Sequence, residues 1–493
     1  MKLDPEVPRL ARTMWKRFVL AALLIVVMSA GTTATAALLE VKDIEQTISL
    51  GGTKQRLDVP TTPAQAGAPQ TILLLGSDVR KSERERGLKG NSDTMILVRL
   101  DPNKQATALL SIPRDLKATI RHPKGGVETA KINAAYSYGG PALTVSTIER
   151  NLPGITINHV VNINFRGFRE AVNHVGCIYA DIDRRYFNDN ARLYAEIDVK
   201  PGYQKLCGDD ALDYVRFRHE DTDLVRGARQ QDFLRQAKDQ LGASEFITDR
   251  KAFAKIFGRY ADTDIRGTQE LLRIFKLVAF SAGNPIREVP FQTKIGPSFV
   301  ESSEAQKRKT VQEFLNPRER VAPRRGNLKP SAAERIAAQR RKKLPRVADG
   351  LEDAKTAGED QAIEAQPKIR FPVYYPRLRT QGSQYSDVPR TYLIRDKDGK
   401  AHHAYRMVIK KGSLGEYYGV QGMDWKDAPI FEGKHETIRI GRRQFDVYFD
   451  GKRVRLIVLK APRAVYYVSN TLLLSLDNRQ MYTIAKSLQR IQG

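Results

Sequence analysis

Three stretches decide the fold of this chain: ILLLGSDVR at 72–80, NSDTMILVRLDP at 91–102 and LLSIPRDL at 109–116. Each carries a short apolar run that is typical of a buried strand. The second and third runs are separated by a hairpin-length loop, so we expect these two strands to be antiparallel. The first strand can run parallel or antiparallel to the third. If it runs parallel, one edge of the sheet collects the residues that follow the first and third strands and those that precede the second.

Charged side chains gather at this predicted edge. Asp78 and Arg80 follow the first strand, Asp93 precedes the second, and Arg114 and Asp115 follow the third. Ligands of open α/β sheets bind at such strand ends. Carboxylate oxygens suit Mg²⁺, and guanidinium groups match phosphate oxygens. Each aspartate taken alone could equally cap a helix or a turn, but their joint placement predicts a metal-assisted phosphate site.

A second basic cluster surrounds the segment VRFR. If this segment is extended, its period of two places Arg216 and Arg218 on one face. In the helix expected next, Arg226 and Gln230 are four residues apart and share a face, while Asp223 caps the helix start. The alternative is a solvated basic face paired with nearby aspartates. Apolar residues alternate with the arginines, which favours anion binding instead.

The charge balance and one apolar segment predict the compartment. The 493 residues include 82 Lys and Arg against 56 Asp and Glu, a net charge of +26 that attracts polyanions. Residues 18–39 carry no charge and are long enough to cross a hydrocarbon core of about 30 Å. The basic residues of the 1–17 tail favour a cytoplasmic N-terminus.

We therefore expect a single-pass anchor in the cell membrane, with the rest of the chain outside the cytoplasm. This placement argues against nucleic acid as a partner. A cleaved signal peptide is the alternative, because residues 34–36 form an A-x-A-like site.

The rest of the chain divides by composition and pattern into four parts: a stalk at 40–69, an α/β domain at 70–300, a charged linker with helical stretches at 301–368 and a smaller β-rich α+β domain at 369–493. Within the α/β domain we expect a helix that starts near Pro141, another from about 223 to 241, and mainly helical structure over 246–300. The aromatic strands of the last domain either bind wall polymer or pack against the α/β domain.

The two cysteines of the sequence, Cys177 and Cys207, lie in the part expected outside the cytoplasm, where disulfides persist. We predict a disulfide between them, worth roughly 3–4 kcal/mol by the chain-entropy argument. Two free buried thiols are the alternative. So few cysteines exclude a disulfide-dense scaffold and a cysteine-rich metal site.

Six segments, in their order along the chain, resemble the LytR-CpsA-Psr (LCP) family of cell-wall glycopolymer ligases. They are the three stretches quoted above together with KINAAYSYGGP at 131–141, INHVVNINFRGF at 157–168 and ALDYVRFRHEDTDLVRGARQQDFL at 211–234. One departure is Cys177, where many members have a second glycine after Gly176. The resemblance implies an α/β fold with a central mixed sheet flanked by helices, and a deep apolar pocket for a polyprenyl tail.

The resemblance also implies a reaction and its residues. The reaction is transfer of a glycopolymer from a polyprenyl-pyrophosphate carrier to a peptidoglycan hydroxyl, with a phosphodiester-type linkage. The implied partners are therefore that carrier, peptidoglycan and the membrane. Asp78 and Asp93 would coordinate Mg²⁺ or Mn²⁺, and Asp115 would act as a base or an orienting residue. The phosphates would be held by Arg114, Arg216, Arg218, Arg226 and Gln230, with Arg80 as a further candidate.

The residues alone leave three other functions open. A lipid pyrophosphate hydrolase would use the same side chains with water as the acceptor. A non-catalytic anchor would tether wall polymers through its basic surface. A DNA-binding regulator is suggested only by the net charge and requires the residues after 40 to lie in the cytoplasm.

Overall fold

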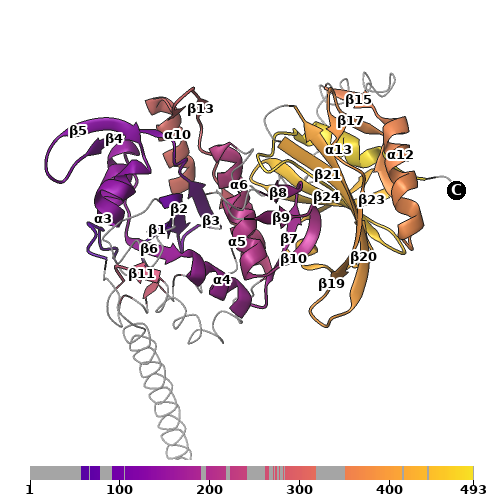
Figure 1. The fold of residues 1–493 in the computed structure, drawn as a ribbon, viewed down its shortest axis with the longest axis horizontal. Helices are drawn as coiled ribbons and strands as arrows, with labels where there is room; N and C mark the ends of the chain where they lie inside the picture. The colour runs from indigo at the N-terminus through magenta and orange to yellow at the C-terminus, as the bar shows by residue number, and fades with distance from the viewer. Residues whose placement is uncertain are drawn as a thin grey trace, which may run out of the picture.

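The computed structural model describes residues 57–65, 67–77, 92–104, 106–189, 196–217, 222–240, 261–265, 270, 273–274, 277, 281, 284–317, 350–412, 416–440 and 443–491. They form an N-terminal α/β domain and a C-terminal sheet-rich domain that lie side by side (Figure 1). The predicted membrane segment 18–39 and its basic tail fall outside the described residues. Within the described ranges, no helix is both long and apolar enough to cross a membrane.

A six-stranded mixed sheet forms the centre of the N-terminal domain. In spatial order its strands are β11 (Ala261–Thr263), β6 (His159–Asn164), β1 (Gln70–Ser77), β2 (Ser92–Leu100), β3 (Thr107–Ser111) and β12 (Ile286–Glu288). β2 is antiparallel to both β1 and β3, so β1 and β3 run in the same direction, and β6 is parallel to β1. The predicted strand directions and the α/β class are confirmed.

Helices pack on both faces of this sheet: α3 (Ala134–Asn151) on one face, and α4 (Phe165–His174), α5 (Gly208–Arg216) and α6 (Asp223–Gln240) on the other. On the α3 face, Val145 and Ile148 are fully buried against Leu73 and Leu97. Leu74 alternates to the opposite face, where it lines a cavity formed with α4 to α6. The alternating apolar residues of β1 thus bury both faces of the sheet.

Four short strand pairs extend the N-terminal domain: β4 (Lys117–Arg121) with β5 (Val127–Lys131), β7 (Ile178–Ile182) with β10 (Gly202–Leu206), β8 (Tyr186–Asn188) with β9 (Ile197–Val199), and β13 (Lys294–Ile295) with β14 (Val300–Glu301).

Helix α3 begins at Ala134, earlier than the predicted start near Pro141. Gly140 has a φ of +68° and interrupts the helix, and a second helical part starts at Pro141. Glycine adopts positive φ readily and proline suits a first helical position, so the sequence pattern revealed the second part alone. Within 246–300, which we expected to be mainly helical, the described residues include the edge strands β11 and β12. The expectation is wrong at these two strands.

The charged linker expected at 301–368 is wrong at its N-terminal end. α10 (Glu304–Leu315) buries Val311 and Phe314 in the same core as α3. Apolar residues at helical spacing bury one face of a helix even where the composition around them is charged. Residues 318–349 lie outside the described part of the chain.

Two other boundaries shift. Leu57 and Val59, in the predicted stalk, pack against the core of the N-terminal domain, which therefore begins before residue 70. β15 (Leu351–Asp353) and α12 (Lys355–Ala365) belong to the C-terminal domain, which therefore begins before residue 369.

An eight-stranded antiparallel sheet forms the centre of the C-terminal domain. Its strands follow the path β18 (Gln384–Tyr385), β20 (Ala401–Lys411), β21 (Glu416–Met423), β25 (Val465–Ser469), β24 (Arg453–Lys460), β23 (Arg443–Asp450) and β22 (Glu436–Ile440), with β19 (Arg390–Arg395) paired to β20. One face packs against α12 and α13 (Asn478–Lys486). The remaining elements are β16 (Tyr374–Pro376), β17 (Leu378–Thr380), β26 (Leu488–Arg490), η1 (Gln366–Lys368) and η2 (Pro429–Phe431).

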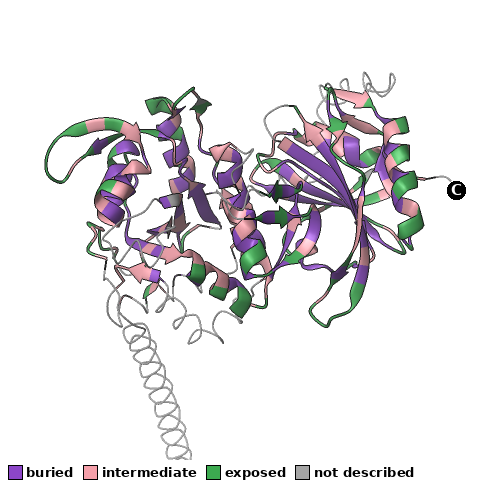
Figure 2. Ribbon diagram, in the orientation of Figure 1, coloured by how far each residue is buried: buried purple, intermediate pink, exposed green. Residues whose placement is uncertain are grey.

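The other face of this sheet packs against the N-terminal domain. The ring centroids of Tyr179 and Tyr203, from the β7–β10 pair, lie 5.2 and 6.2 Å from that of Trp425. A buried ion pair joins Asp181 to Arg406 at 3.4 Å. The strands of both sheets are largely buried (Figure 2). The domains thus share a core, and these aromatic residues serve packing.

Candidate functional site

The ends of the central strands meet at one edge of the sheet. Ser77, the last residue of β1, pairs with Ser92, the first residue of β2, whereas Gly76 pairs with Thr94. Asp93 is therefore the extra residue of a β-bulge, a feature that is common beside active sites. β3 and β6 run parallel to β1 and end towards the same edge.

Several predicted site residues fall outside the described part of the chain. They are Asp78, Arg80, Arg218 and the side chain of Asp93. Among the described residues, no three His, Cys, Asp or Glu side chains gather into a group that could hold a metal ion. The described carboxylates of this edge contact cationic side chains instead.

Arg114 is held firmly just beyond the end of β3. Its backbone N–H donates to Oδ2 of Asp223 at 2.5 Å, and its carbonyl accepts the N–H of Asn133 at 3.2 Å. The Nε atom of Arg114 lies 3.4 Å from Oδ1 of Asp115 and 3.9 Å from Oδ1 of Asp223. Two carboxylates and the backbone therefore position this guanidinium.

Asp223 has a larger role than the helix cap that the sequence predicts. It is the first residue of α6, and its Oδ1 atom accepts a hydrogen bond from Nη2 of Arg226. The same carboxylate contacts Arg114, which lies 109 residues earlier in the chain. Asp223 thus couples two of the predicted phosphate-binding arginines. Asp223 lies three residues before Arg226, and this spacing is the one signal in the sequence that indicates the contact between these two residues.

Asp115 lies between two cations. Its Oδ1 atom is 3.4 Å from Nε of Arg114 and 3.2 Å from Nζ of Lys131. The backbone carbonyl of Asp115 accepts the N–H of Val300 at 2.9 Å, which ties the segment to β14. Of the two roles implied for Asp115, this arrangement favours the orienting one.

Arg216 ends a helix and does not lie on an extended strand. The N–H of Phe217 donates to the carbonyl of Asp213 at 3.1 Å, and Nη2 of Arg216 lies 2.6 Å from Oδ1 of Asp213. The extended conformation considered for 215–218 is therefore wrong at Val215 and Arg216, which belong to α5, and Arg218 lies outside the described residues. An acidic and a basic residue three apart pair on a helix. Burial raises the pKa of Asp213, and the charge of Arg216 opposes that rise.

An apolar cavity of about 130 Å³ lies between the sheet and helices α4, α5 and α6. Arg216 and Gln230 supply polar groups to a wall that is otherwise mainly apolar. Nε2 of Gln230 donates to Oγ1 of Thr94 at 3.0 Å and to the carbonyl of Val215 at 3.1 Å, so this residue joins α6 to both β2 and α5. The apolar residues of the wall are Leu74, Leu75, Ile96, Ile163, Phe165, Phe168, Leu212, Val215, Phe233 and Leu234.

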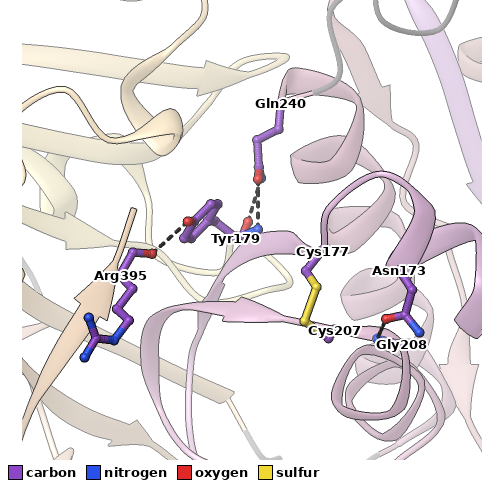
Figure 3. The surroundings of a disulfide bond; sticks show 7 residues. All are labelled: Asn173, Cys177, Tyr179, Cys207, Gly208, Gln240 and Arg395. Carbon is purple, nitrogen blue, oxygen red and sulfur yellow. Dashed lines mark hydrogen bonds between the residues drawn. A yellow bond between two sulfur atoms is a disulfide. The ribbon is translucent and has the colours of Figure 1, made fainter. Parts of the chain in front are cut away.

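The structure contains the predicted disulfide between Cys177 and Cys207 (Figure 3). Cys177 follows α4 and has a φ of +70°, a conformation that favours glycine. Cys207 is the residue directly before α5, where the N–H of Gly208 also donates to Oδ1 of Asn173 at 2.7 Å. The disulfide thus links the end of α4 to the start of α5, and both helices line the cavity.

The amino-acid sequence matches a known family. The sequence profile of the LytR_cpsA_psr family matches residues 27–313, more than half of the chain. The chain belongs to the LytR-CpsA-Psr family. The matched region begins within the predicted membrane segment 18–39 and ends inside α10, in agreement with the packing of that helix on the N-terminal domain.

Individual LytR-CpsA-Psr proteins are similar over part of their length. The polyisoprenyl-teichoic acid–peptidoglycan teichoic acid transferase TagV of Bacillus subtilis is 34% identical over 210 residues, which are 41% of this chain and 51% of the relative. TagU of Bacillus cereus, a transferase with the same enzyme name, is 35% identical over 178 residues, which are 36% of this chain and 53% of the relative. The crystal structure of B. subtilis TagV covers 51% of this chain and 98% of its own, with 30% identity and a TM-score of 0.42. The chain spans about half the length of the curated relatives.

Proposed function

We propose that this chain transfers a glycopolymer from a polyprenyl-pyrophosphate carrier to a hydroxyl group of peptidoglycan. The observation that carries the proposal is the adjacency of two environments. Asp223 holds Arg114 and Arg226 at the strand edge, and Arg216 and Gln230 lie at the neighbouring apolar cavity. An amphipathic lipid pyrophosphate needs both, because guanidinium groups bind its phosphates and apolar side chains cover its hydrocarbon.

The names of the relatives support the same reaction class. TagV and TagU are named as transferases that act between polyisoprenyl-teichoic acid and peptidoglycan. For this chain we propose the finer statement that a phosphodiester is formed. Residues 18–39 would anchor the chain as a single span, with the N-terminal tail in the cytoplasm and both domains outside it. The disulfide supports that placement, because disulfides persist in oxidising compartments.

The proposed step forms one bond and breaks one bond. The oxygen of the acceptor hydroxyl bonds to the sugar-bearing phosphorus, and the bond between that phosphorus and the bridging oxygen breaks. The electron pair leaves with prenyl phosphate, and the hydroxyl proton passes to a base. Negative charge builds on the leaving oxygens, so preorganised arginines stabilise the transition state more than the ground state. Arg114, Arg216, Arg226 and Gln230 would hold the phosphates, together with Arg80 and Arg218.

Asp78 and Asp93 are the proposed ligands of a divalent cation, Mg²⁺ or Mn²⁺. In the sequence Asp78 directly follows Ser77, the last residue of β1, and the backbone of Asp93 occupies the bulge of β2 beside it. Hard oxygen donors suit Mg²⁺. A divalent ion held there would add positive charge beside the pyrophosphate oxygens.

The test is transfer of a labelled lipid-linked glycopolymer to peptidoglycan by the full chain in detergent. We expect Arg114→Ala to lower the rate by about 10²–10³-fold, the usual cost of losing one preorganised donor. Arg463→Ala changes an exposed arginine of the β24–β25 turn and serves as the matched control. Equal rates for Arg114→Ala and the wild type would contradict the proposal. Label released into water with no attachment to peptidoglycan would instead identify a pyrophosphate hydrolase.

A further inference from the structure

A groove of about 520 Å³ runs between the two domains. Its volume lies within the range of about 300–1,000 Å³ that is usual for ligand sites. Helix α6 forms one wall, and the β23–β24 turn and the loop 472–475 of the C-terminal domain form the other. This groove is distinct from the apolar cavity described above.

The groove reaches the proposed phosphate site. Pro113 and Asp223, which line it, are the residue before Arg114 and the carboxylate that holds Arg114. Helix α6 separates the groove from the apolar cavity: Gln231 faces the groove, whereas Gln230 faces the cavity. The proposed phosphate-binding residues at the start of α6 thus lie between the apolar cavity and the groove, whose lining is partly polar and partly apolar.

The wall from the C-terminal domain is firmly built. Gly451, in the β23–β24 turn, has a φ of +56°, and a Cβ atom added there would lie 2.8 Å from Nη1 of Arg287. In the adjacent loop, Oδ1 of Asn470 accepts the N–H of Leu476 at 3.1 Å, while Leu473 remains 41% exposed. Leu474 has a φ of +51°, which is uncommon for a residue with a side chain. The fold holds this loop in place although it exposes a large apolar side chain to solvent.

Buried ionic contacts keep the two walls in register. Nε of Arg235, on α6, lies 3.0 Å from Oε1 of Glu288. The backbone N–H of Glu288 donates to the carboxylate of Asp450, at the end of β23. Arg455 of β24 lines the same small polar cavity as these groups. The groove is therefore preformed, with no domain closure needed to build it.

The geometry points to the acceptor glycan strand of peptidoglycan as the occupant of this groove, and this inference rests on the proposed function. In a phosphoryl transfer the attacking and leaving oxygens lie roughly in line across the phosphorus. The leaving prenyl phosphate has its hydrocarbon on the cavity side of α6, so the attacking hydroxyl must approach from the other side, where the groove lies.

The groove lining carries both signs of charge, with Asp223, Glu288, Glu313 and Asp450 beside Arg287, Lys452 and Arg453. Asp223 and Glu288 pair with Arg226 and Arg235 of α6, and the exposed basic residues suit a sugar chain with carboxylate substituents. Leu224 and Leu473 offer apolar surface to the flat faces of sugar rings, and Gln231 offers an amide to their hydroxyl groups. Lys452 and Arg453 are exposed at the rim and can pair with the carboxylates. The C-terminal domain thus supplies half of an acceptor site.

Binding of a tetrasaccharide of alternating N-acetylglucosamine and N-acetylmuramic acid to the full chain in detergent, without donor, tests this inference. Leu473→Asp and Lys452→Glu should each weaken binding, Leu473→Asp by about tenfold or more because one leucine loses its burial. Leu393→Asp and Lys397→Glu change exposed residues at β19 and its turn and should bind as the wild type does. A wild-type chain that does not bind the tetrasaccharide, or unchanged affinity in both groove variants, overturns the inference.

Transfer kinetics then separate the two sugar-bearing substrates. The groove variants should raise KM for peptidoglycan by a similar factor and leave KM for the lipid-linked donor unchanged. A rise in the donor KM alone would place the donor's own sugars in the groove and refute the acceptor assignment. A wild-type chain that binds the tetrasaccharide but transfers nothing would defeat the proposed function and leave the glycan site standing.

Discussion

Replacing Asp450 by Asn should remove part of the pH dependence of the free energy of unfolding. Burial raises the pKa of Asp450 from an ordinary 3.8 to about 6, although the guanidinium groups of Arg235, Arg287 and Arg455 oppose the rise. A carboxyl group with a higher pKa in the folded chain binds protons more tightly there, so its contribution is favourable in acid and is lost as the pH rises through about 6.

The magnitude follows from the two pKa values. Each unit of difference between the two pKa values corresponds to about 1.4 kcal/mol. The free energy of unfolding is therefore about 3 kcal/mol lower at neutral pH, where Asp450 is charged, than in strong acid, where it is protonated. Burial also raises the pKa of Glu288, and the charge of Asp450 adds to that rise. The free energy of unfolding of Asp450→Asn, relative to the wild type, should therefore increase by about 2–3 kcal/mol from pH 4 to pH 7.

Urea unfolding at a series of pH values measures this difference. Trp425 packs on Tyr179 and Tyr203 at the domain interface, so its fluorescence reports separation of the domains. Trp15, the other tryptophan, is replaced by Phe in every variant to isolate that signal. Asp398→Asn, at an exposed turn, is the control and should follow the wild type at all pH values. Parallel profiles for Asp450→Asn and the wild type would refute the reasoning.

Three further predictions concern the site. Asp223→Asn should lower the transfer rate by about 10²–10³-fold, since Arg114 and Arg226 lose the charge that holds them; steady-state kinetics with a rate near that of the wild type would contradict this role. Replacing both Cys177 and Cys207 by Ser should lower the free energy of unfolding by roughly 3–4 kcal/mol, measured in urea against the oxidised wild type, and an unchanged midpoint would show that the crosslink constrains nothing. Chelation of divalent cations should abolish transfer and added Mg²⁺ should restore it; full activity after exhaustive chelation would exclude the proposed ion.

Much of the N-terminal domain could be predicted because its signals are local. The strand runs, the loop length between the second and third strands, and the apolar spacing of α6 each lie within a short window. The prediction failed at 215–216, which belong to α5, because alternation over four residues cannot exclude a helix. It failed at α10 because many of the surrounding residues are charged, which indicated a linker. The burial of Val311 and Phe314 depends on a core formed by residues far away in the chain.

The sequence by itself determined the direction of the central strands, the family, and the set of charged residues that follow those strands, because periodicity and motif order are written in neighbouring residues. The tertiary structure alone decided that Asp223 joins Arg114 to Arg226 across 109 residues, and that the C-terminal domain closes a groove beside them. Those contacts arise from the packing of α6 on β3, where a Cβ atom on Gly227 would lie 2.7 Å from Oγ of Ser111, and from a buried interface between two sheets. Such packing depends on side-chain volumes that are far apart in the chain and meet only when it folds.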